Sequence, residues 1–316
     1  MLKIAVIGCG NIAQRSVIPA LLTSGVSEIA VCIDKEPLRG QEIAEKFKLP
    51  FETSFNRAIE EYSFEAVYIS TPNATHKEII LDAARSKKHI ICEKSIVCNP
   101  DEAKEIVDFC LEKDVAVFGG FMYQFHTQHQ VVRDLIEKEE IGTPFHFQAW
   151  FGFPPISINN FRYSKLMGGG AILDAGAYTV HAARKFFNAE PKNVYSIIEN
   201  DGLEVEIRGT AMIDFGDSGT AHIAFGFNNF YQNRYTIWGT KGLISLERAF
   251  AVPPDFNSKL TLMKQDSYQE FSLEPCNHFI EEIIFFSKHF RNVDFRKVWG
   301  DEIIKQSIAL NFLRTL

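Results

Sequence analysis

Short apolar runs alternate with helical segments over roughly the first 120 residues of this 316-residue chain. Two helix starts are clearly marked, one by Thr75 ahead of Glu78 and one by Asn99 followed by Pro100. The strand-like runs are 3–7, 28–33, 65–70, 89–92 and 115–118, and helical segments include 76–88 and 100–113. This alternation predicts βαβ units and a parallel sheet.

After about residue 120 the pattern changes to long stretches of β-branched and aromatic residues. These stretches are 145–153, 193–199, 204–215, 219–227, 234–247 and 259–273, and helices are expected at 128–140, 170–187, 277–290 and from about 301 onward. Glycine-bounded turns at 216–219 and 239–242 indicate hairpins. We therefore predict a second domain with a mainly antiparallel sheet, and a cleft between the domains as the default place for a substrate.

The first apolar run leads directly into a glycine turn, Gly8-Cys9-Gly10-Asn11-Ile12-Ala13, and the second run ends on Asp34. Gly8 permits a tight turn, Gly10 lets the backbone approach a pyrophosphate, and Ala13 is small enough for the next helix to pack on the strand. The free N–H groups and positive dipole end of that helix then face the phosphates. In this context the turn predicts a bound dinucleotide, the alternative being a strand–turn–helix with incidental glycines.

Composition narrows the possible partners. Hydrophobic residues make up 46% and charged residues 23%, as in an ordinary soluble protein. The net charge of −7 comes from 33 basic and 40 acidic residues spread along the chain without a basic stripe, so we expect neither nucleic acid nor a membrane surface as partner. The six cysteines form no C-x-x-C pair, so no metal site is expected. Met1 leads straight into the first strand, which favours the cytoplasm.

Polar residues follow three of the predicted parallel strands, where ligands of such sheets bind. They are Thr71-Pro72-Asn73 with His76, then Glu93-Lys94-Ser95, then residues 119–126. Lys94 ends a strand that should be buried on both faces, where its ammonium would bond a substrate oxygen or a ribose hydroxyl; the alternative is a solvated loop lysine. His76 is as well placed to cap or pack against its helix as to contact a cofactor.

A second group of polar residues lies in the predicted helix after Gly168-Gly169-Gly170. Asp174, Tyr178 and His181 are spaced to share one helix face, which suggests the wall of a cleft. Because Lys185 continues the stripe, an ordinary solvent-facing helix is the alternative. Three glycines before the helix favour the cleft, since they permit close approach of the backbone to a ligand.

Lys94 and Tyr178 make chemical sense as a pair. A tyrosine can donate a proton to a carbonyl that accepts hydride, but its ordinary pKa of about 10 is too high for easy cycling near neutrality. A nearby ammonium would lower that pKa by favouring the phenolate. The sequence has no H-E-x-x-H, G-x-S-x-G or Walker motif, so hydrolase and phosphotransferase functions lack support.

These motifs, in this order and spacing, resemble the glucose-fructose oxidoreductase / inositol dehydrogenase / MocA (Gfo/Idh/MocA) family over nearly the whole chain. They are the glycine turn at Gly8, Thr71-Pro72-Asn73 with His76, Glu93-Lys94, residues 121–126, Gly168 with Asp174-x-Gly176-x-Tyr178, and Gly239-Thr240-x-Gly242. The resemblance implies an α/β protein with a Rossmann domain (1–121) and an α/β domain with an open, mainly antiparallel sheet (122–316), whose last helix can pack back on the first domain.

The resemblance also implies hydride exchange between a nicotinamide cofactor and a sugar, sugar nucleotide or polyol. By resemblance Lys94 lies beside the nicotinamide, Tyr178 is the acid/base, and Asp174 and Arg162 contact substrate. Tyr123, Gln124 and His181 complete the expected substrate side. The residues expected to bind cofactor are Gly8, Gly10, Asn11, Ile12, Ala13, Asp34, Lys35, Thr71, Pro72, Asn73, His76, Glu93 and Lys94.

The chain resembles the branch with tyrosine at this position, which includes xylose and dihydrodiol dehydrogenases and sugar-nucleotide ketoreductases. It departs from the family pattern in three places. Ser95 replaces a proline, Gln124 stands where this branch commonly has arginine, and His181 replaces an acidic residue of the His-type members. We expect Ser95 to alter loop stiffness, since serine does not impose the turn that proline favours.

Asp34 favours NAD over NADP, because a carboxylate accepts ribose hydroxyls and repels a 2′-phosphate; Lys35 would partly relieve that repulsion. Two further functions stay open beside the sugar oxidoreductase: a non-catalytic NAD(P)-binding sensor, and a dihydrodiol-type dehydrogenase. Retention of Lys94 and Tyr178 favours an enzyme. An apolar far face of the open sheet predicts a homo-oligomer, a dimer or tetramer, paired through that sheet.

Overall fold

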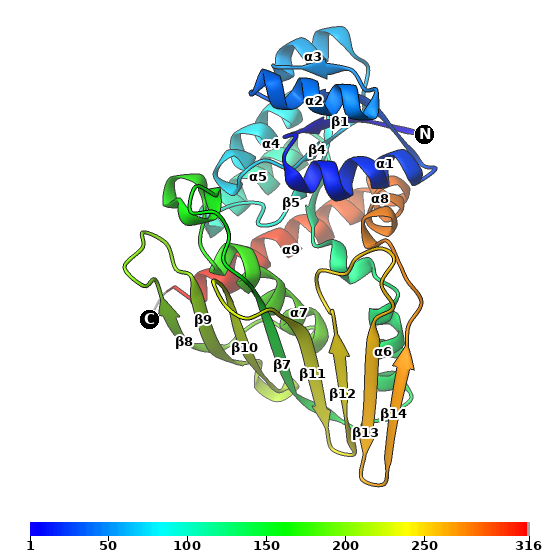
Figure 1. Ribbon diagram of the computed structural model, residues 1–316, viewed down its shortest axis with the longest axis vertical. Helices are drawn as coiled ribbons and strands as arrows, with labels where there is room; N and C mark the ends of the chain where they lie inside the picture. Colours follow the sequence, from blue (N-terminus) through cyan, green and yellow to red (C-terminus); the bar gives the residue numbers. More distant parts are fainter. Residues whose placement is uncertain (315–316) are drawn as a thin grey trace. The chain divides into compact units, whose positions relative to one another are not determined.

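The structure is a computed structural model that describes residues 1–314, and its contacts divide the chain into two units (Figure 1). The first unit contains Met1–Met122 and Phe279–Ile304. The second contains Tyr123–His278 and the chain from Lys305 onward. Helix α9 (Val293–Phe312) therefore begins in the first unit and ends in the second.

A parallel sheet in the order β3-β2-β1-β4-β5-β6 forms the first unit. Its central strands are mainly apolar because helices cover such a sheet on both faces; every residue of β4 is buried, and in β1 only Lys3 is exposed. The strands are β1 (Leu2–Ile7), β2 (Ser27–Ile33), β3 (Phe51–Glu52), β4 (Ala66–Ile69), β5 (His89–Glu93) and β6 (Val117–Gly120). The strand order reverses between β1 and β4, so the loops after these strands and after β5 share the edge where such sheets bind ligands.

Both helix starts that the sequence marks, after Thr75 and after Asn99, lie where they are predicted. The helices of the first unit are α1 (Ile18–Thr23), α2 (Pro37–Phe47), α3 (Phe55–Glu61), α4 (His76–Arg85), α5 (Pro100–Glu112) and most of α8 (His278–His289). Asn99 caps α5, with its side chain accepting the Glu102 N–H at 3.0 Å. The predicted cap at Thr75 is wrong: α4 continues from a 3₁₀ turn, η2 (Asn73–Thr75), and the Thr75 hydroxyl bonds Thr71 and the Pro72 carbonyl instead.

The second unit is built on a sheet in the order β14-β13-β12-β11-β7-β10-β9-β8. Among the described strand pairs of this second sheet, only β7 and β10 run parallel, and the other pairs are antiparallel. The strands are β7 (Pro144–Phe153), β8 (Asn193–Glu199), β9 (Arg208–Asp214), β10 (Thr220–Phe227), β11 (Gln232–Gly239), β12 (Gly242–Glu247), β13 (Lys259–Lys264) and β14 (Ser267–Ser272). The predicted class, an α/β protein with one parallel and one mainly antiparallel sheet, is confirmed.

Helix α7 (Ala177–Phe187) packs on β7 and β10 and covers the centre of this sheet (Figure 1). A π-helical turn, η6 (Ile172–Gly176), leads into it, and α6 (Gln128–Glu137) precedes β7. The sheet has one buried and one exposed face, as the alternating burial of β9 shows. The predicted hairpin turns at 216–219 and 239–242 are confirmed, since they join β9 to β10 and β11 to β12 as antiparallel pairs. The stretch 259–273, predicted without a turn, is also a hairpin, and the last helix begins at Val293 rather than near 301.

Candidate active site

The glycine turn after β1 has the shape that a pyrophosphate requires. Gly8 has φ +93°, and a Cβ there would lie 2.7 Å from the Thr71 side chain, so no other residue fits. At Gly10 no atom lies within 4 Å of the position of a Cβ, so the backbone is open on that side. Ala13 is fully buried under the helix that follows. These residues fit a dinucleotide cofactor at the helix start.

Asp34 closes this turn from the end of β2. Its carboxylate accepts the Cys9 N–H at 2.8 Å and the Glu36 N–H at 2.9 Å, and Arg39 Nη1 lies 3.5 Å from Oδ2. The carboxylate is 5% exposed, whereas the Arg39 side chain is half exposed. Asp34 therefore holds the loop as well as facing the site, and a cation that the sequence analysis did not single out lies beside it.

His76 joins the loops after β4 and β5. Its Nε2 lies 2.8 Å from the Thr71 carbonyl, and its Nδ1 lies 3.0 Å from the Ser95 carbonyl. Burial lowers the pKa of the ring, which has no exposed surface. The expected direct contact between His76 and a cofactor does not fit this burial. The ring instead lies between the Thr71 and Ser95 carbonyls, and in its neutral form it donates its single N–H to one of them.

Lys94 follows directly from β5 and is half-buried, with the buried Glu93 before it. The Lys94–Ser95 peptide bond is cis, although serine does not impose that geometry. Glu93 accepts a hydrogen bond from the Tyr68 hydroxyl at 2.9 Å, so its carboxylate points into the unit. Because the Glu93 carboxylate is engaged in this way, we still predict a cofactor contact only for the Glu93 backbone.

In the second unit Tyr178 lies in an aromatic pocket. The Phe151 ring meets it edge-on at 5.1 Å between centroids, and the rings of Tyr123 and Phe250 are each 5.9 Å away. The tyrosine is 5% exposed. Because the residues from Ala171 to Arg184 are buried, the alternative of an ordinary solvent-facing helix is wrong.

An ion pair lies beside Tyr178. Arg162 Nε is 2.5 Å from Asp174 Oδ2, and both side chains are largely buried. Asp174 raises the pKa of Arg162, and a charged Tyr178 would raise it further, so guanidinium and phenol are electrostatically coupled. The structure thus brings three of the predicted site residues together in one unit.

Tyr123 and His181 form a second pair in this unit. The Tyr123 hydroxyl lies 2.7 Å from His181 Nδ1, and burial together with the Arg184 charge lowers the pKa of His181, so the imidazole is neutral. His181 has no exposed surface, so the expected direct substrate contact does not fit; it supports Tyr123 instead. Gln124 is half-buried and remains a predicted substrate contact.

Two glycines of the triplet pack closely against the protein's own chain. A Cβ on Gly169 would lie 2.4 Å from the Arg162 carbonyl oxygen, and one on Gly170 would lie 2.5 Å from the Glu206 carboxylate. The Gly170 N–H also donates to the Arg162 carbonyl at 2.9 Å. These two glycines therefore hold the backbone of Arg162, and the expected approach of the triplet to a ligand stays a prediction.

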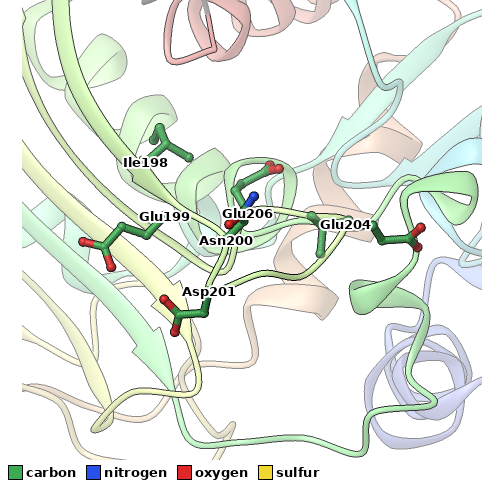
Figure 2. A pocket seen from close by; sticks show the side chains of 7 residues that line it. Ile198, Glu199, Asn200, Asp201, Glu204 and Glu206 are labelled. Atoms are coloured by element: carbon green, nitrogen blue, oxygen red, sulfur yellow. The ribbon is translucent and has the colours of Figure 1, made fainter.

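A hollow of about 440 Å³ opens elsewhere in the second unit (Figure 2). It is lined by Ile198, Glu199, Asn200, Asp201, Glu204, Val205 and Glu206. Its carboxylates already have partners within the chain: Glu199 and Asp201 pair with Arg208, and Glu204 accepts the Lys165 N–H at 2.8 Å. None of the predicted site residues lines this hollow.

Among residues 1–314, no cluster of three or more His, Cys, Asp or Glu side chains could hold a metal ion. Within the same residues no helix is both long and apolar enough to cross a bilayer.

The sequence alone did not single out Arg39, which looks like one of many surface cations. It also missed Glu282 of α8, an acid with no exposed surface, because nothing in the sequence pattern marks this side chain as buried.

Two family models cover most of the chain. The model described as an oxidoreductase family with an NAD-binding Rossmann fold matches residues 2–121, and the model of the GFO/IDH/MocA C-terminal domain matches residues 129–245.

Similar proteins of known name cover nearly the same length. The chain is 29% identical, over 98% of its length and 95% of the relative, to a dTDP-3,4-didehydro-2,6-dideoxy-α-D-glucose 3-reductase of Saccharopolyspora spinosa. It is 25% identical to a D-xylose 1-dehydrogenase (NADP⁺) of Haloferax volcanii, over 90% of this chain and 87% of the relative.

A solved structure has the same fold. A 3-ketoreductase of Actinomadura kijaniata in complex with NADP and TDP-benzene superposes with a TM-score of 0.94 at 27% identity, over 99% of this chain and 97% of that one. With both family models matched in order, the chain belongs to the GFO/IDH/MocA family of oxidoreductases and carries its NAD-binding Rossmann fold.

Proposed function

We propose that the protein is an NADP(H)-dependent ketoreductase that reduces a keto group on a deoxysugar carried by a nucleoside diphosphate. The observation that carries the proposal is the aromatic pocket around Tyr178, with the Arg162–Asp174 pair beside the phenol. The similarity to sugar-nucleotide 3-reductases over almost the whole chain supports this substrate class.

In the proposed mechanism Tyr178 donates a proton to the substrate oxygen as the adjacent carbon accepts hydride. The bound coenzyme supplies the hydride. Lys94 bonds the same oxygen and favours the phenolate that remains on Tyr178. Arg162, oriented by Asp174, holds the substrate side of the pocket, and the surrounding rings exclude water.

The separation of the two residues in sequence supports this assignment. The A. kijaniata ketoreductase has also been solved as a tyrosine-to-phenylalanine variant and as a lysine-to-alanine variant. Those two positions are 84 residues apart, as are Lys94 and Tyr178 here. The same spacing in a chain of the same fold favours equivalent positions.

Substrate screening tests the proposed function. We expect NADPH oxidation with a dTDP-linked 3-keto-deoxysugar and at least about 100-fold lower kcat/KM with the free sugar, because the nucleotide contributes binding energy away from the reacting carbon. The assay follows NADPH absorbance with both substrates and with D-xylose plus NADP⁺. Equal efficiency with free sugars would contradict the sugar-nucleotide proposal, and coenzyme binding without any turnover would favour the sensor.

The coenzyme proposal revises the preference for NAD that Asp34 suggested. The relatives offer that preference no support, since NADP is the coenzyme in their names and structures. Here the Asp34 carboxylate is already engaged by two N–H groups and by Arg39, which reduces its repulsion of a phosphate. We infer that Arg39 and Lys35 receive the 2′-phosphate.

Replacing Arg39 tests this inference. R39A is expected to raise the Kd for NADPH about tenfold, as for the loss of one charge-assisted hydrogen bond, while leaving the Kd for NADH unchanged. Fluorescence titration of both coenzymes gives the two values, with R85A, an exposed arginine paired to Asp82, as the control. Tighter binding of NADH than of NADPH by the unmodified protein would overturn the inference.

We also propose that a second copy of this chain covers the exposed face of the second sheet. That face presents large apolar side chains, which a monomer rarely leaves in contact with water. They include Tyr195, Ile197, Met212, Trp238 and Tyr268. The number of subunits would follow from how many copies share the face.

A further inference from the structure

Two carboxyl groups and one phenol form a buried polar cluster in the first unit, and the proposed mechanism uses none of them. The Tyr68 hydroxyl of β4 lies 2.9 Å from Glu93 Oε1 and 3.4 Å from Glu282 Oε2 of α8. Tyr68 and Glu282 have no exposed surface, and Glu93 is 8% exposed. Apolar side chains of β4 and β5 surround them, so ionic groups here need strong compensation.

The number of hydrogen atoms in the cluster decides which group donates in each of the two contacts. The Tyr68 hydroxyl carries one hydrogen, so it donates to one carboxyl group only. The shorter contact assigns that hydrogen to Glu93. The remaining contact, between two oxygens, is attractive only if Glu282 carries a proton on Oε2 and donates it to the phenol oxygen.

The surroundings of Glu282 agree with a neutral acid. Its other oxygen, Oε1, has no hydrogen-bond partner within residues 1–314. An ionised carboxylate in that position would be without the donors that buried charges require. Burial, reinforced by the nearby Glu93, holds the pKa of Glu282 well above its usual range.

Glu93 is the member of the cluster that touches the site. Burial raises its pKa, but the adjacent Lys94 ammonium, the Tyr68 hydroxyl and the Lys94 N–H all favour the charged form. The 2.9 Å contact makes the Glu93 carboxylate the acceptor of the Tyr68 hydroxyl, at the end of a chain of two hydrogen bonds. On the other side of Lys94, His76 Nδ1 lies 3.0 Å from the Ser95 carbonyl oxygen, so buried side chains contact the backbone on both sides of Lys94.

We propose that Glu282 is a carboxylic acid that acts as a positioning residue: it donates to Tyr68, Tyr68 donates to Glu93, and this chain sets the position of Lys94. The positioning role of Glu282 rests on the proposed function of Lys94. The protonated state of Glu282 does not depend on that function, so the role and the protonation state are tested by different measurements.

Three variants separate a positioning role from a packing role. E282Q keeps a donor toward Tyr68 in a side chain of the same shape, E282L keeps the volume without a donor, and Y68F removes the link. We expect E282Q to retain the kcat of the unmodified protein. E282L and Y68F should each lower kcat about tenfold with little change in the Kd for coenzyme, because a misplaced Lys94 affects the reacting oxygen most.

The double variant Y68F/E282L should lose no more than either single variant, since both changes break one chain of hydrogen bonds. A loss equal to the product of the two single losses would show independent packing effects and overturn the proposal. Impairment of E282Q to the level of E282L would overturn it as well, because it would mean that the charge of Glu282 is required.

Measurements without turnover test the same proposal if no substrate is found. Infrared difference spectra between the unmodified protein and E282Q at pH 7.5 should show the carbonyl band of a protonated carboxyl group. A crystal structure of E282L should show Lys94 displaced from its position in the unmodified protein. Absence of the band, or an unmoved Lys94, would contradict the proposal whatever the substrate.

Discussion

Replacing Tyr178 by phenylalanine is expected to lower kcat about 10³-fold while the Kd for NADPH stays unchanged. The phenol is the proposed proton donor, and removing a general acid typically costs between about 10² and 10⁴ in rate. The aromatic pocket of Phe151, Tyr123 and Phe250 accepts the phenylalanine ring without a change in shape. The fold should therefore survive, and the loss should be confined to chemistry.

A matched control is available in the same unit, on strand β11. Tyr235 is also buried, and its hydroxyl lies 3.0 Å from His129 Nδ1, but it has no place in the proposed mechanism. Y235F should retain most of the turnover. Steady-state kinetics and NADPH titration on both variants decide the matter, and Y178F with unchanged kcat would remove Tyr178 from the mechanism.

The second large effect is loss of stability in mild acid. Three histidines of the second unit, His126, His129 and His278, are buried, and burial lowers their pKa values to about 4, about 3 and about 3. The rings of His126 and His278 are 5.9 Å apart, so charging one opposes charging the other. In the unfolded chain all three titrate near a pKa of about 6.5.

The sign follows from proton uptake. Below about pH 6.5 the unfolded chain binds protons that the folded protein does not, so stability falls as the pH drops toward the folded values. At pH 5 each histidine destabilises the folded state by up to about 2 kcal/mol, and the three by up to about 6 kcal/mol. That is a large share of the total stability of an ordinary domain.

Urea unfolding at pH 7.5 and at pH 5 measures this loss. H126Q, which cannot take up a proton, should reduce the difference between the two pH values by up to about 2 kcal/mol, the contribution of that one histidine. Raised pKa values at Glu93 and Glu282 act in the opposite direction, since the folded state then gains protons ahead of the unfolded chain. An H126Q variant with the same difference between pH 7.5 and pH 5 as the unmodified protein would contradict the depressed pKa of His126.

Local patterns predicted the architecture well for physical reasons. Parallel strands buried on both faces must be continuously apolar, and a turn that admits a pyrophosphate needs glycine at positions such as Gly8, whose φ is +93°. The Asn99 cap followed the same logic, because its side chain satisfies a helix N–H that has no other partner.

Long-range burial was not predictable in the same way. Glu282 lies in α8 next to a second acid, Glu281, and only the fold shows which of the two side chains is enclosed with Tyr68. The glycine triplet implied close approach but did not reveal that the Arg162 backbone packs against Gly169. His76 and His181 lie in the expected region, yet their burial makes them supports for other residues.

The central proposal is that the amine of Lys94 and the phenol of Tyr178 act on the same substrate oxygen. A crystal structure with NADPH and a dTDP-linked sugar tests it most directly. We predict Lys94 Nζ and Tyr178 Oη each within about 3.2 Å of the hydroxyl at the reacting carbon. If the Tyr178 hydroxyl faces away from that carbon, or Lys94 lies beyond contact with it, the proposed mechanism is contradicted.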